Sequence, residues 1–285
     1  MINLKSPAKI NLRLEVLGRL PNKYHLLRMF NITVDLCDLI RIDFRSKTIK
    51  VEVDDPLVPG GAKNFAYKAA DYFKRKYKTG FGAKIQIHKN IPVGGGLGGG
   101  SSNAATVLGA LMKKFKVRES DLDREEVAYH VGADVPYLIS GGPAWVSGVG
   151  EKIEPAPGFP ELFFLLMKPG FSVSTTEIYR SLKPGSNLTT APKEAILTQL
   201  ARGDWKRFCV NHLEKVVFAK HPELSEMKSE IVRLGAEAAV MSGSGSTLVG
   251  IFSDQEPAVQ AARKLKQRHK KLWVKLVNQY QPEHG

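Results

Sequence analysis

The chain has 285 residues, enough for two domains of ordinary size, and its 43% hydrophobic and 25% charged residues are typical of a globular protein and exclude a disordered one. Forty-two lysine and arginine residues against 28 acidic residues give a net charge of +14, which favours anionic partners such as nucleotides, phosphorylated metabolites, nucleic acid or membrane. Cys37 and Cys209 lie far apart with no Cys-x-x-Cys pair, so neither a disulfide scaffold nor a zinc site is expected. The N-terminus lacks a signal-peptide core, and the longest apolar run, 162–167, is too short to span a bilayer. We therefore expect a cytoplasmic protein that binds no membrane.

Strands dominate the first 55 residues. Apolar and polar residues alternate from Ile10 to Val16, which predicts a half-buried strand, and the alternation recurs at 32–36, 40–42 and 49–53. Together these segments predict a β-meander. Further elements are expected over 64–77 (helix), 85–87 (strand), 104–115 (helix), 124–131 (helix) and 144–146 (strand).

Prolines and glycines at 155–160 mark a domain boundary, so we expect domains of residues 1–156 and 157–285. The second domain is expected to begin with a strand over 162–168, followed by a helix that opens at Ser174 with Glu177 completing a capping box. Two or three helices are expected over 193–234, strands at 240 and 249–251, a helix over 255–269 and a strand over 272–277. This order predicts a two-lobed α+β enzyme.

A glycine-rich segment occupies the middle of the first domain. Six glycines fill seven positions from Gly94 to Gly100, directly before an amphipathic helix. Glycines let the backbone approach a ligand closely, and a helix N-terminus attracts anions, so the segment predicts a triphosphate site. Ser101, Ser102 or Asn103 is expected to cap the helix. The alternative is a flexible linker, which the adjoining helix disfavours.

The segment differs from the common phosphate loops. A Walker A loop ends in Gly-Lys-Ser/Thr, whereas Ser101 follows Gly100 directly. The pattern G-x-G-x-x-G does occur, but lysines at 113–116 occupy the region where a dinucleotide-binding fold needs an acidic residue. Protein-kinase signatures are missing.

Three segments together resemble the GHMP family of small-molecule kinases, which includes galactokinase, homoserine kinase and mevalonate kinase. They are Ser6-Pro7-Ala8-Lys9-Ile10-Asn11-Leu12, the loop from Pro92 to Ser102, and Ser242-Gly243-Ser244-Gly245-Ser246. Residues 132–136 and 148–151 resemble members whose acceptor carries a cytidine diphosphate group. The resemblance spans most of the chain and implies a ribosomal-S5-like N-terminal lobe, a ferredoxin-like C-terminal lobe and a site between them. One departure is Lys23, where the family commonly has glycine.

The resemblance implies ATP-dependent phosphorylation of a 2-hydroxyl group, with ATP and Mg²⁺ as cofactors. Asp134 would accept the hydroxyl proton and Lys9 would orient it. Asn64 would recognise adenine, and Ser101 or Ser102 would lie near the metal. The implied ATP-binding residues are Asn64, Lys89, Pro92, Gly94, Gly95, Gly96, Leu97, Gly98, Gly99, Gly100, Ser101 and Ser102. The implied acceptor-binding residues are Asn11, Tyr24, His25, Tyr179, Ser242, Gly243, Ser244 and Gly245.

Plainer interpretations of these residues remain open. Lys9 by itself is typical of a solvated strand edge, Asp134 of a helix cap, and Tyr24 or Tyr179 of packing. Homoserine or mevalonate is the alternative acceptor, which the tyrosines disfavour because neither molecule offers a base for stacking. The charge and the basic residues of 264–275 also suggest an RNA-binding protein, but no RNA-binding motif accompanies them. We therefore expect no nucleic-acid partner, and a monomer or homodimer.

Overall fold

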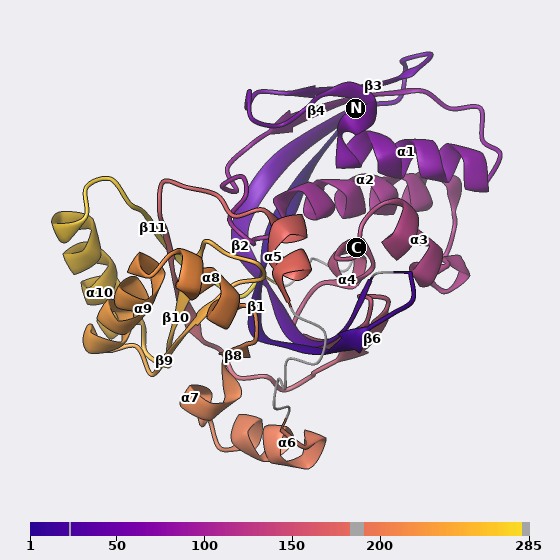
Figure 1. Cartoon of the computed structure of the whole chain (residues 1–285). Coiled ribbons are helices and arrows are strands. Elements are labelled where there is room, and N and C mark those ends of the chain that lie inside the picture. The colour runs from indigo at the N-terminus through magenta and orange to yellow at the C-terminus, as the bar shows by residue number, and fades with distance from the viewer. Residues whose placement is uncertain (23, 183–190, 281–285) are drawn as a thin grey trace.

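Two β-sheets divide the described part of the chain into two lobes (Figure 1). The computed structural model describes residues 1–22, 24–182 and 191–280. The strands in chain order are β1 (Ile2–Arg19), β2 (His25–Asp43), β3 (Ile49–Val53), β4 (Ala83–His88), β5 (Ala144–Gly148), β6 (Lys152–Pro155), β7 (Phe163–Lys168), β8 (Val210–Asn211), β9 (Ala238–Met241), β10 (Leu248–Phe252) and β11 (Trp273–Asn278). The first sheet has the order β3-β4-β2-β1-β8, with β5 pairing with β2 and β6 with β5, and the second has the order β11-β7-β10-β9.

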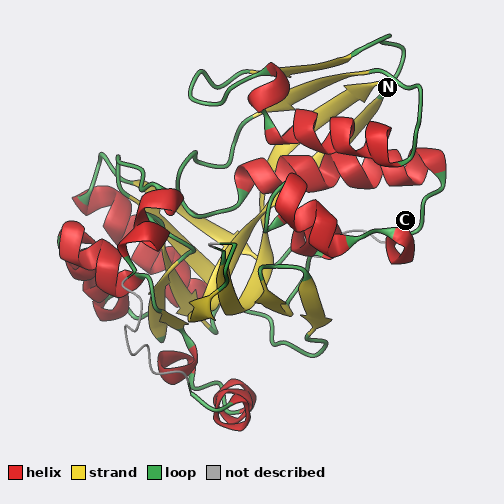
Figure 2. Cartoon of the chain, turned by 45° about the vertical axis from the view of Figure 1, so that its right-hand side comes forward, coloured by secondary structure: helices red, strands yellow, loops and turns green. Residues whose placement is uncertain are grey.

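Helices cover both sheets (Figure 2). They are α1 (Phe65–Lys76), α2 (Gly99–Phe115), α3 (Arg124–His130), α4 (Val135–Ser140), α5 (Thr175–Ser181), α6 (Lys193–Ala201), α7 (Trp205–Phe208), α8 (Glu214–Lys220), α9 (Glu223–Arg233) and α10 (Gln255–Arg268), with short 3-10 helices at Gly61–Lys63 and Glu119–Asp121. Helices α1 and α2 lie side by side over the first sheet, and α9 and α10 pack on the second. Among the described residues, no helix combines the length and apolar composition needed to cross a bilayer.

Most predicted strands and helices are confirmed, but the predicted β-meander is wrong at its third strand. Strand β4 lies between β2 and β3, and β3 runs parallel to β4. Parallel neighbours need a crossover, which α1 supplies between them. Hydrophobic alternation marks residues as strand but does not choose the partner of that strand, so the pairing was not predictable from it.

The middle of strand β1, residues 6–16, is buried on both faces, whereas the alternation predicted a half-buried strand. The apolar residues Ile10 and Leu12 are fully buried, and the alternating polar residues Lys9, Asn11, Arg13 and Glu15 are at most 4% exposed. The glycine-rich segment and the second lobe cover the polar face. Hydrophobic alternation cannot predict this covering, because it reports only on neighbouring residues. Contacts from outside the first sheet therefore bury polar residues in the middle of β1.

A buried charge cluster joins β1 and β2 to later parts of the chain. Glu15, fully buried, accepts hydrogen bonds from Arg13 (2.8 Å) and Arg28 (2.6 Å). The two arginines donate in turn to the carbonyl oxygens of Phe208 and Ala191, both at 2.7 Å. Burial by itself would raise the pKa of Glu15, but the two arginines outweigh it and hold the pKa below its ordinary value.

Several short elements escaped the sequence patterns. Strands β6 and β8 and helix α4 were not expected, and four helices, α6 to α9, occupy the described residues between Lys193 and Leu234 in place of two or three. Strand β8 pairs in parallel with β1, so a segment from the second half of the chain extends the first sheet. We propose that the domains divide at residues 156 and 157, between β6 and β7.

Candidate active site

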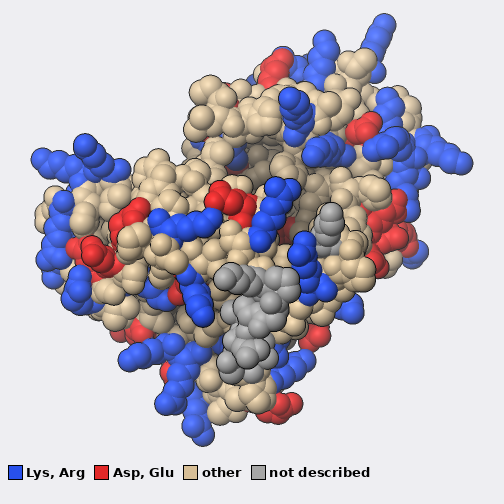
Figure 3. All heavy atoms as spheres, viewed as in Figure 1, with Lys and Arg blue, Asp and Glu red and all other residues tan. Residues whose placement is uncertain are grey.

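A cavity of about 470 Å³ lies between the two lobes. Residues of the glycine-rich segment form one wall, and Thr175, Tyr179, Gly243 and Ser244 of the second lobe contribute to another. Figure 3, viewed as Figure 1, shows a hollow in the surface, with lysine and arginine side chains around it and over the rest of the visible surface. An anionic ligand would be attracted to this face as a whole, so recognition must come from the cavity lining.

The glycine-rich segment leads into the N-terminus of α2, and this end of the helix has no side-chain cap. Gly98 is the N-cap residue, with φ of +68°, and the helix begins at Gly99. The expectation that Ser101, Ser102 or Asn103 caps the helix is therefore wrong, because all three lie inside it. Without a capping side chain, the amide groups of the first helical turn are available to an anion in the cavity.

Two glycines are required by close approach. A Cβ on Gly96 would lie 2.1 Å from the carbonyl oxygen of Ser242, and a Cβ on Gly98 would lie 2.9 Å from Cγ of Lys9. Strand β1 is also tied to the segment directly, because the amide of Lys9 donates to the carbonyl oxygen of Leu97 at 3.0 Å. The conformation of the segment thus depends on both lobes.

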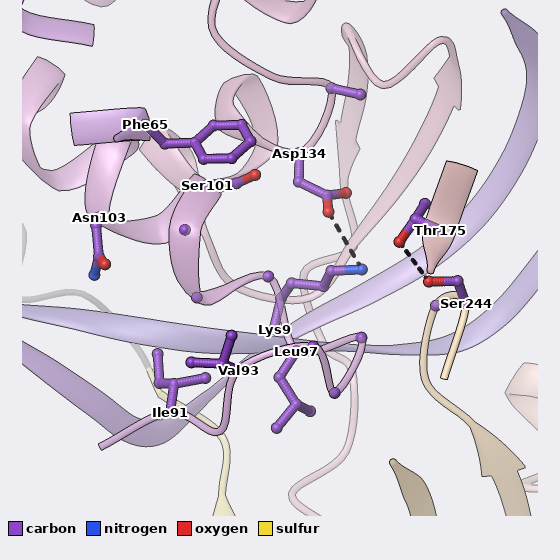
Figure 4. Close-up of a pocket in the computed structure, with 18 of the residues that line it drawn as sticks. Lys9, Phe65, Ile91, Val93, Leu97, Ser101, Asn103, Asp134, Thr175 and Ser244 are labelled. Carbon is purple, nitrogen blue, oxygen red and sulfur yellow. Dashed lines mark hydrogen bonds and ion pairs between the residues drawn. The ribbon is translucent and has the colours of Figure 1, made fainter. Parts of the chain in front are cut away.

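Lys9 and Asp134 meet at the floor of the cavity (Figure 4). The Lys9 ammonium lies 3.5 Å from the Asp134 carboxylate and donates to Oδ1 of Asn11 at 2.7 Å. Asn11 in turn donates to Oδ1 of Asn31 at 2.6 Å. Lys9 is 4% exposed, so the solvated strand edge is wrong for it, and Asp134 makes no capping hydrogen bond at the start of α4. The carboxylate of Asp134 is 30% exposed toward the cavity, where a hydroxyl group could reach it.

Lys89, which follows β4, also lines the cavity. Its ammonium pairs with the buried carboxylate of Asp38 and donates to Oδ1 of Asn103 at 3.3 Å. Asp38 also accepts the amides of Asn90 (2.8 Å) and Ile91 (2.9 Å), at the start of the glycine-rich segment. Sequence reasoning missed Asp38, although its period-two spacing from Leu36 and Ile40 indicates the buried face.

The two candidate metal-binding serines differ in their surroundings. Ser101 lines the cavity, whereas Ser102 is 1% exposed and donates to the carbonyl oxygen of Pro7 at 2.6 Å. No group of three acidic, histidine or cysteine side chains among the described residues is arranged to hold a metal ion. Of the two serines, therefore, only Ser101 lies at the cavity surface.

Asn64 lies at the far end of the cavity but uses its side chain as a helix cap. Its Oδ1 accepts the amide of Ala66 and its Nδ2 donates to the carbonyl oxygen of Pro59, both at 2.8 Å. Phe65, which was not anticipated, is 39% exposed beside it. Phe65 and Leu57 give this end of the cavity an apolar lining that suits a flat base, whereas the Asn64 amide is already engaged in two hydrogen bonds.

The aromatic residues expected at the acceptor end are paired differently from the prediction. The Tyr24 ring meets Tyr129 edge-on with centroids 5.0 Å apart, while the His25 ring lies 5.0 Å from Tyr179 at 36°. Of the three aromatic residues predicted to bind the acceptor, Tyr24, His25 and Tyr179, only Tyr179 lines the cavity. Burial and then the charge of Arg19 lower the pKa of His25, which favours its neutral ring. Lys23 lies outside the described residues.

The loop of 242–246 holds the glycine-rich segment. Ser242 Oγ donates to the carbonyl oxygen of Gly96 at 3.0 Å, and the amide of Thr247 donates to that of Gly95 at 3.2 Å. Ser244 shares a 2.7 Å hydrogen bond with Thr175, a cavity residue that sequence reasoning missed (Figure 4). The loop is thus more than a tight connection between strands.

The structure brings most of the predicted residues together and leaves some outside. Residues at the cavity surface are Lys9, Asn64, Lys89, Pro92, Gly94, Gly95, Gly96, Leu97, Gly98, Gly99, Gly100, Ser101, Asp134, Tyr179, Gly243 and Ser244. Residues that do not line it are Asn11, Tyr24, His25, Ser102, Ser242 and Gly245.

Comparison with known proteins agrees with this architecture. Residues 64–142 match the GHMP kinases N terminal domain and residues 194–271 match the GHMP kinases C terminal domain. The chain is 38% identical to 4-diphosphocytidyl-2-C-methyl-D-erythritol kinase of Clostridium botulinum, over 95% of this chain and 98% of that protein, and 36% identical to that of Clostridium beijerinckii, over 96% and 99%.

Solved structures give the same result. The crystal structure of 4-(cytidine 5'-diphospho)-2C-methyl-D-erythritol kinase superposes with a TM-score of 0.79 at 33% identity, over 98% of this chain and all of that one. Homoserine kinase of Cytophaga hutchinsonii has a TM-score of 0.74 at 21% identity, over 98% and 95%, and shows the fold alone. The expected two-lobed fold is therefore confirmed, and the chain belongs to the 4-diphosphocytidyl-2-C-methyl-D-erythritol kinases of the GHMP kinase family.

Proposed function

We propose that the chain transfers the terminal phosphate of ATP to the 2-hydroxyl of 4-diphosphocytidyl-2-C-methyl-D-erythritol, a step in non-mevalonate isoprenoid precursor biosynthesis. The observation that carries the proposal is the Lys9–Asp134 pair, held 3.5 Å apart in the same cavity as the uncapped start of α2. The names of the relatives support the choice of acceptor.

Asp134 takes the role of general base, because its carboxylate is exposed to the cavity and occupied by no capping bond. The Lys9 ammonium orients the carboxylate and offsets negative charge that develops on the acceptor oxygen. Asn11 fixes the direction of the Lys9 ammonium by accepting a hydrogen bond from it through Oδ1. Asn11 therefore acts on the acceptor through Lys9.

The phosphates of ATP are assigned to the glycine-rich segment, because it leads into the first turn of α2, whose amides have no side-chain cap. Lys89 contributes charge from the side, tempered by its pairing with Asp38. Mg²⁺, when bound, neutralises phosphate charge and aligns the transferred group, and the Ser101 hydroxyl is the residue that would contact it.

The cytidine end is assigned to Tyr24, His25 and Tyr179. Tyr179 offers an aromatic face to the cavity, and His25 lies against it. For Tyr24 to stack on the same base, its ring must leave Tyr129, so this part of the proposal includes a side-chain rearrangement on binding. A cytoplasmic location and a monomeric or homodimeric state remain predictions.

An acceptor panel tests the function. Purified protein with magnesium and ATP is offered 4-diphosphocytidyl-2-C-methyl-D-erythritol, mevalonate and homoserine, and phosphorylated product is followed by phosphorus NMR. We expect turnover of the first acceptor alone, and inhibition by CMP or CDP. Turnover of mevalonate or homoserine instead would overturn the acceptor assignment and leave the kinase fold intact. Salt-sensitive RNA retention with no phosphorylation of any acceptor would overturn the kinase proposal.

A further inference from the structure

Lys168, the last residue of β7, carries a buried positive charge without an acidic partner. The residue is 8% exposed, and its ammonium donates to the carbonyl oxygens of Pro169 and Phe171, both at 3.1 Å. No carboxylate within the described ranges forms an ion pair with it. Burial lowers its pKa, as expected for a cation removed from water with only carbonyl dipoles to stabilise it. A buried charge of this kind destabilises a protein unless a counter-charge is supplied.

The Lys168 side chain lies against the back of the glycine-rich segment. The position that a Cβ on Gly95 would occupy is 3.2 Å from Cδ and 3.3 Å from Cε of Lys168. Gly95 lines the cavity and Lys168 does not, so one glycine separates the lysine from the ligand side.

The turn after Lys168 is hydrogen-bonded to the residue directly before the glycine-rich segment and, within the second lobe, to the loop of 242–246. Ser172 Oγ donates to the carbonyl oxygen of Val93 at 3.2 Å, and Ser246 Oγ donates to that of Phe171 at 2.8 Å. The two hydrogen bonds of the Lys168 ammonium close this turn on itself. Lys168 therefore stabilises the turn whose Ser172 hydroxyl contacts the chain directly before the glycine-rich segment.

Lys168 differs in one respect from two of the three lysines that line the cavity; the third, Lys63, is exposed to solvent. Lys9 pairs with Asp134 and Lys89 pairs with Asp38, so a carboxylate offsets part of the charge of each. Lys168 has no such partner, so no carboxylate reduces the positive electrostatic potential that its ammonium produces in the cavity. A fixed charge in a surrounding of low polarity acts over several ångströms, because little solvent reorganises to screen it.

We propose that Lys168 is a positioning residue for the nucleotide, whose buried charge stabilises the triphosphate from behind the glycine-rich segment. The phosphate anion supplies the counter-charge that the protein lacks at this point. The inference rests on the proposed use of ATP. It assigns to the second lobe a part in nucleotide binding that neither the glycine motif nor the Lys9–Asp134 pair contains.

The test compares ligands that share a base and differ in charge. Affinities for adenosine, AMP, ADP and ATP are measured by calorimetry at low ionic strength for the wild type, Lys168→Met and Lys168→Gln. Methionine keeps an unbranched stem against Gly95, and glutamine keeps a neutral donor for the carbonyl groups. Lys275→Met, on the exposed side of β11, is the matched control, because it lowers the net charge equally. Thermal unfolding confirms that each variant is folded.

We expect adenosine to bind all four proteins with the same affinity. In both Lys168 variants the loss of affinity relative to the wild type should grow with the number of phosphates, to about tenfold for ATP. That is the order expected for one charge at an effective dielectric constant of ~20. Lys275→Met should bind ATP as the wild type does. Equal weakening of adenosine and ATP would show a purely structural role and overturn the proposal. Wild-type affinity for ATP in Lys168→Gln would overturn it as well, since the hydrogen bonds would then suffice without the charge. A wild-type protein that fails to bind ATP would contradict the proposed function itself, which the same titration distinguishes.

Discussion

Replacement of Gly96 by alanine tests whether the contact between the lobes shapes the nucleotide site. Gly96 has φ of +75°, where an L-residue is strained by roughly 1–2 kcal/mol. Its Cβ would lie 2.1 Å from the carbonyl oxygen of Ser242, so the two backbones must separate by about an ångström. That shift breaks the Ser242 Oγ bond to Gly96 and the Thr247 amide bond to Gly95, each worth about 0.5–1.5 kcal/mol. The sum predicts a destabilisation of about 2–5 kcal/mol.

Thermal unfolding and ATP titration measure the two consequences. At about 2–4 °C per kcal/mol for a chain of this size, the melting temperature of Gly96→Ala should fall by roughly 4–20 °C. The KM for ATP should rise by at least about tenfold, because the displaced segment no longer presents the first turn of α2 to the phosphates.

A glycine inside α2 provides the control. Gly109 lies within the helix with no atom within 4 Å of the position of its Cβ, so Gly109→Ala should stabilise the protein by about 0.5–1 kcal/mol and leave the KM for ATP unchanged. If Gly96→Ala had the melting temperature and the KM for ATP of the wild type, the close approach of the two loops would not contribute to stability or to nucleotide binding in solution. The argument would also fail if both glycine variants behaved alike.

Three further predictions address the chemistry, the acceptor and the pH dependence of stability. Asp134→Asn should lose about 10²–10⁴-fold in kcat while keeping its melting temperature and ATP affinity, and near-normal turnover would remove Asp134 from the role of base. Alanine at Tyr24 or Tyr179 should raise the KM of the cytidine acceptor by about one to two decades, with phenylalanine milder and ATP unaffected; an unchanged acceptor KM would contradict stacking. Glu15→Gln leaves the buried Arg13 and the half-buried Arg28 uncompensated and should cost about 3–5 kcal/mol at neutral pH. Because the folded pKa of Glu15 is depressed, its contribution is present above the ordinary value of 4.5 and is lost as the pH falls through the folded value, so the difference in melting temperature between wild type and variant should narrow in acid. A constant difference would show that Glu15 stabilises by packing alone.

The structure also changes the meaning of residues that the motifs had grouped together. Ser101 and Ser102 are adjacent in the sequence, yet one faces the cavity and the other holds Pro7 from inside the protein. Ser242 and Ser244 divide similarly, since Ser242 holds the glycine-rich segment and Ser244 lines the cavity. Adjacent residues on a helix point in directions about 100° apart, so a motif cannot assign one role to both serines of α2.

The sequence by itself determined the elements and the kind of site. Alternation located β1, glycine before an amphipathic stretch located the anion-binding start of α2, and Asn64 predicted the beginning of α1, because these signals depend on neighbours within a few residues. The motifs carrying Lys9 and Asp134 also predicted that the two residues act together, and the structure places them 3.5 Å apart.

Tertiary structure alone decided which partners the elements and side chains take. It inserted β4 between β2 and β3, paired Lys89 with Asp38, set Tyr24 against Tyr129 and buried Lys168 behind Gly95. The three side-chain contacts each join residues at least 50 positions apart. The strand order depends on the crossover between β3 and β4. Local periodicity carries no information about such contacts, because their free energy arises only when distant segments are brought together and water is excluded between them.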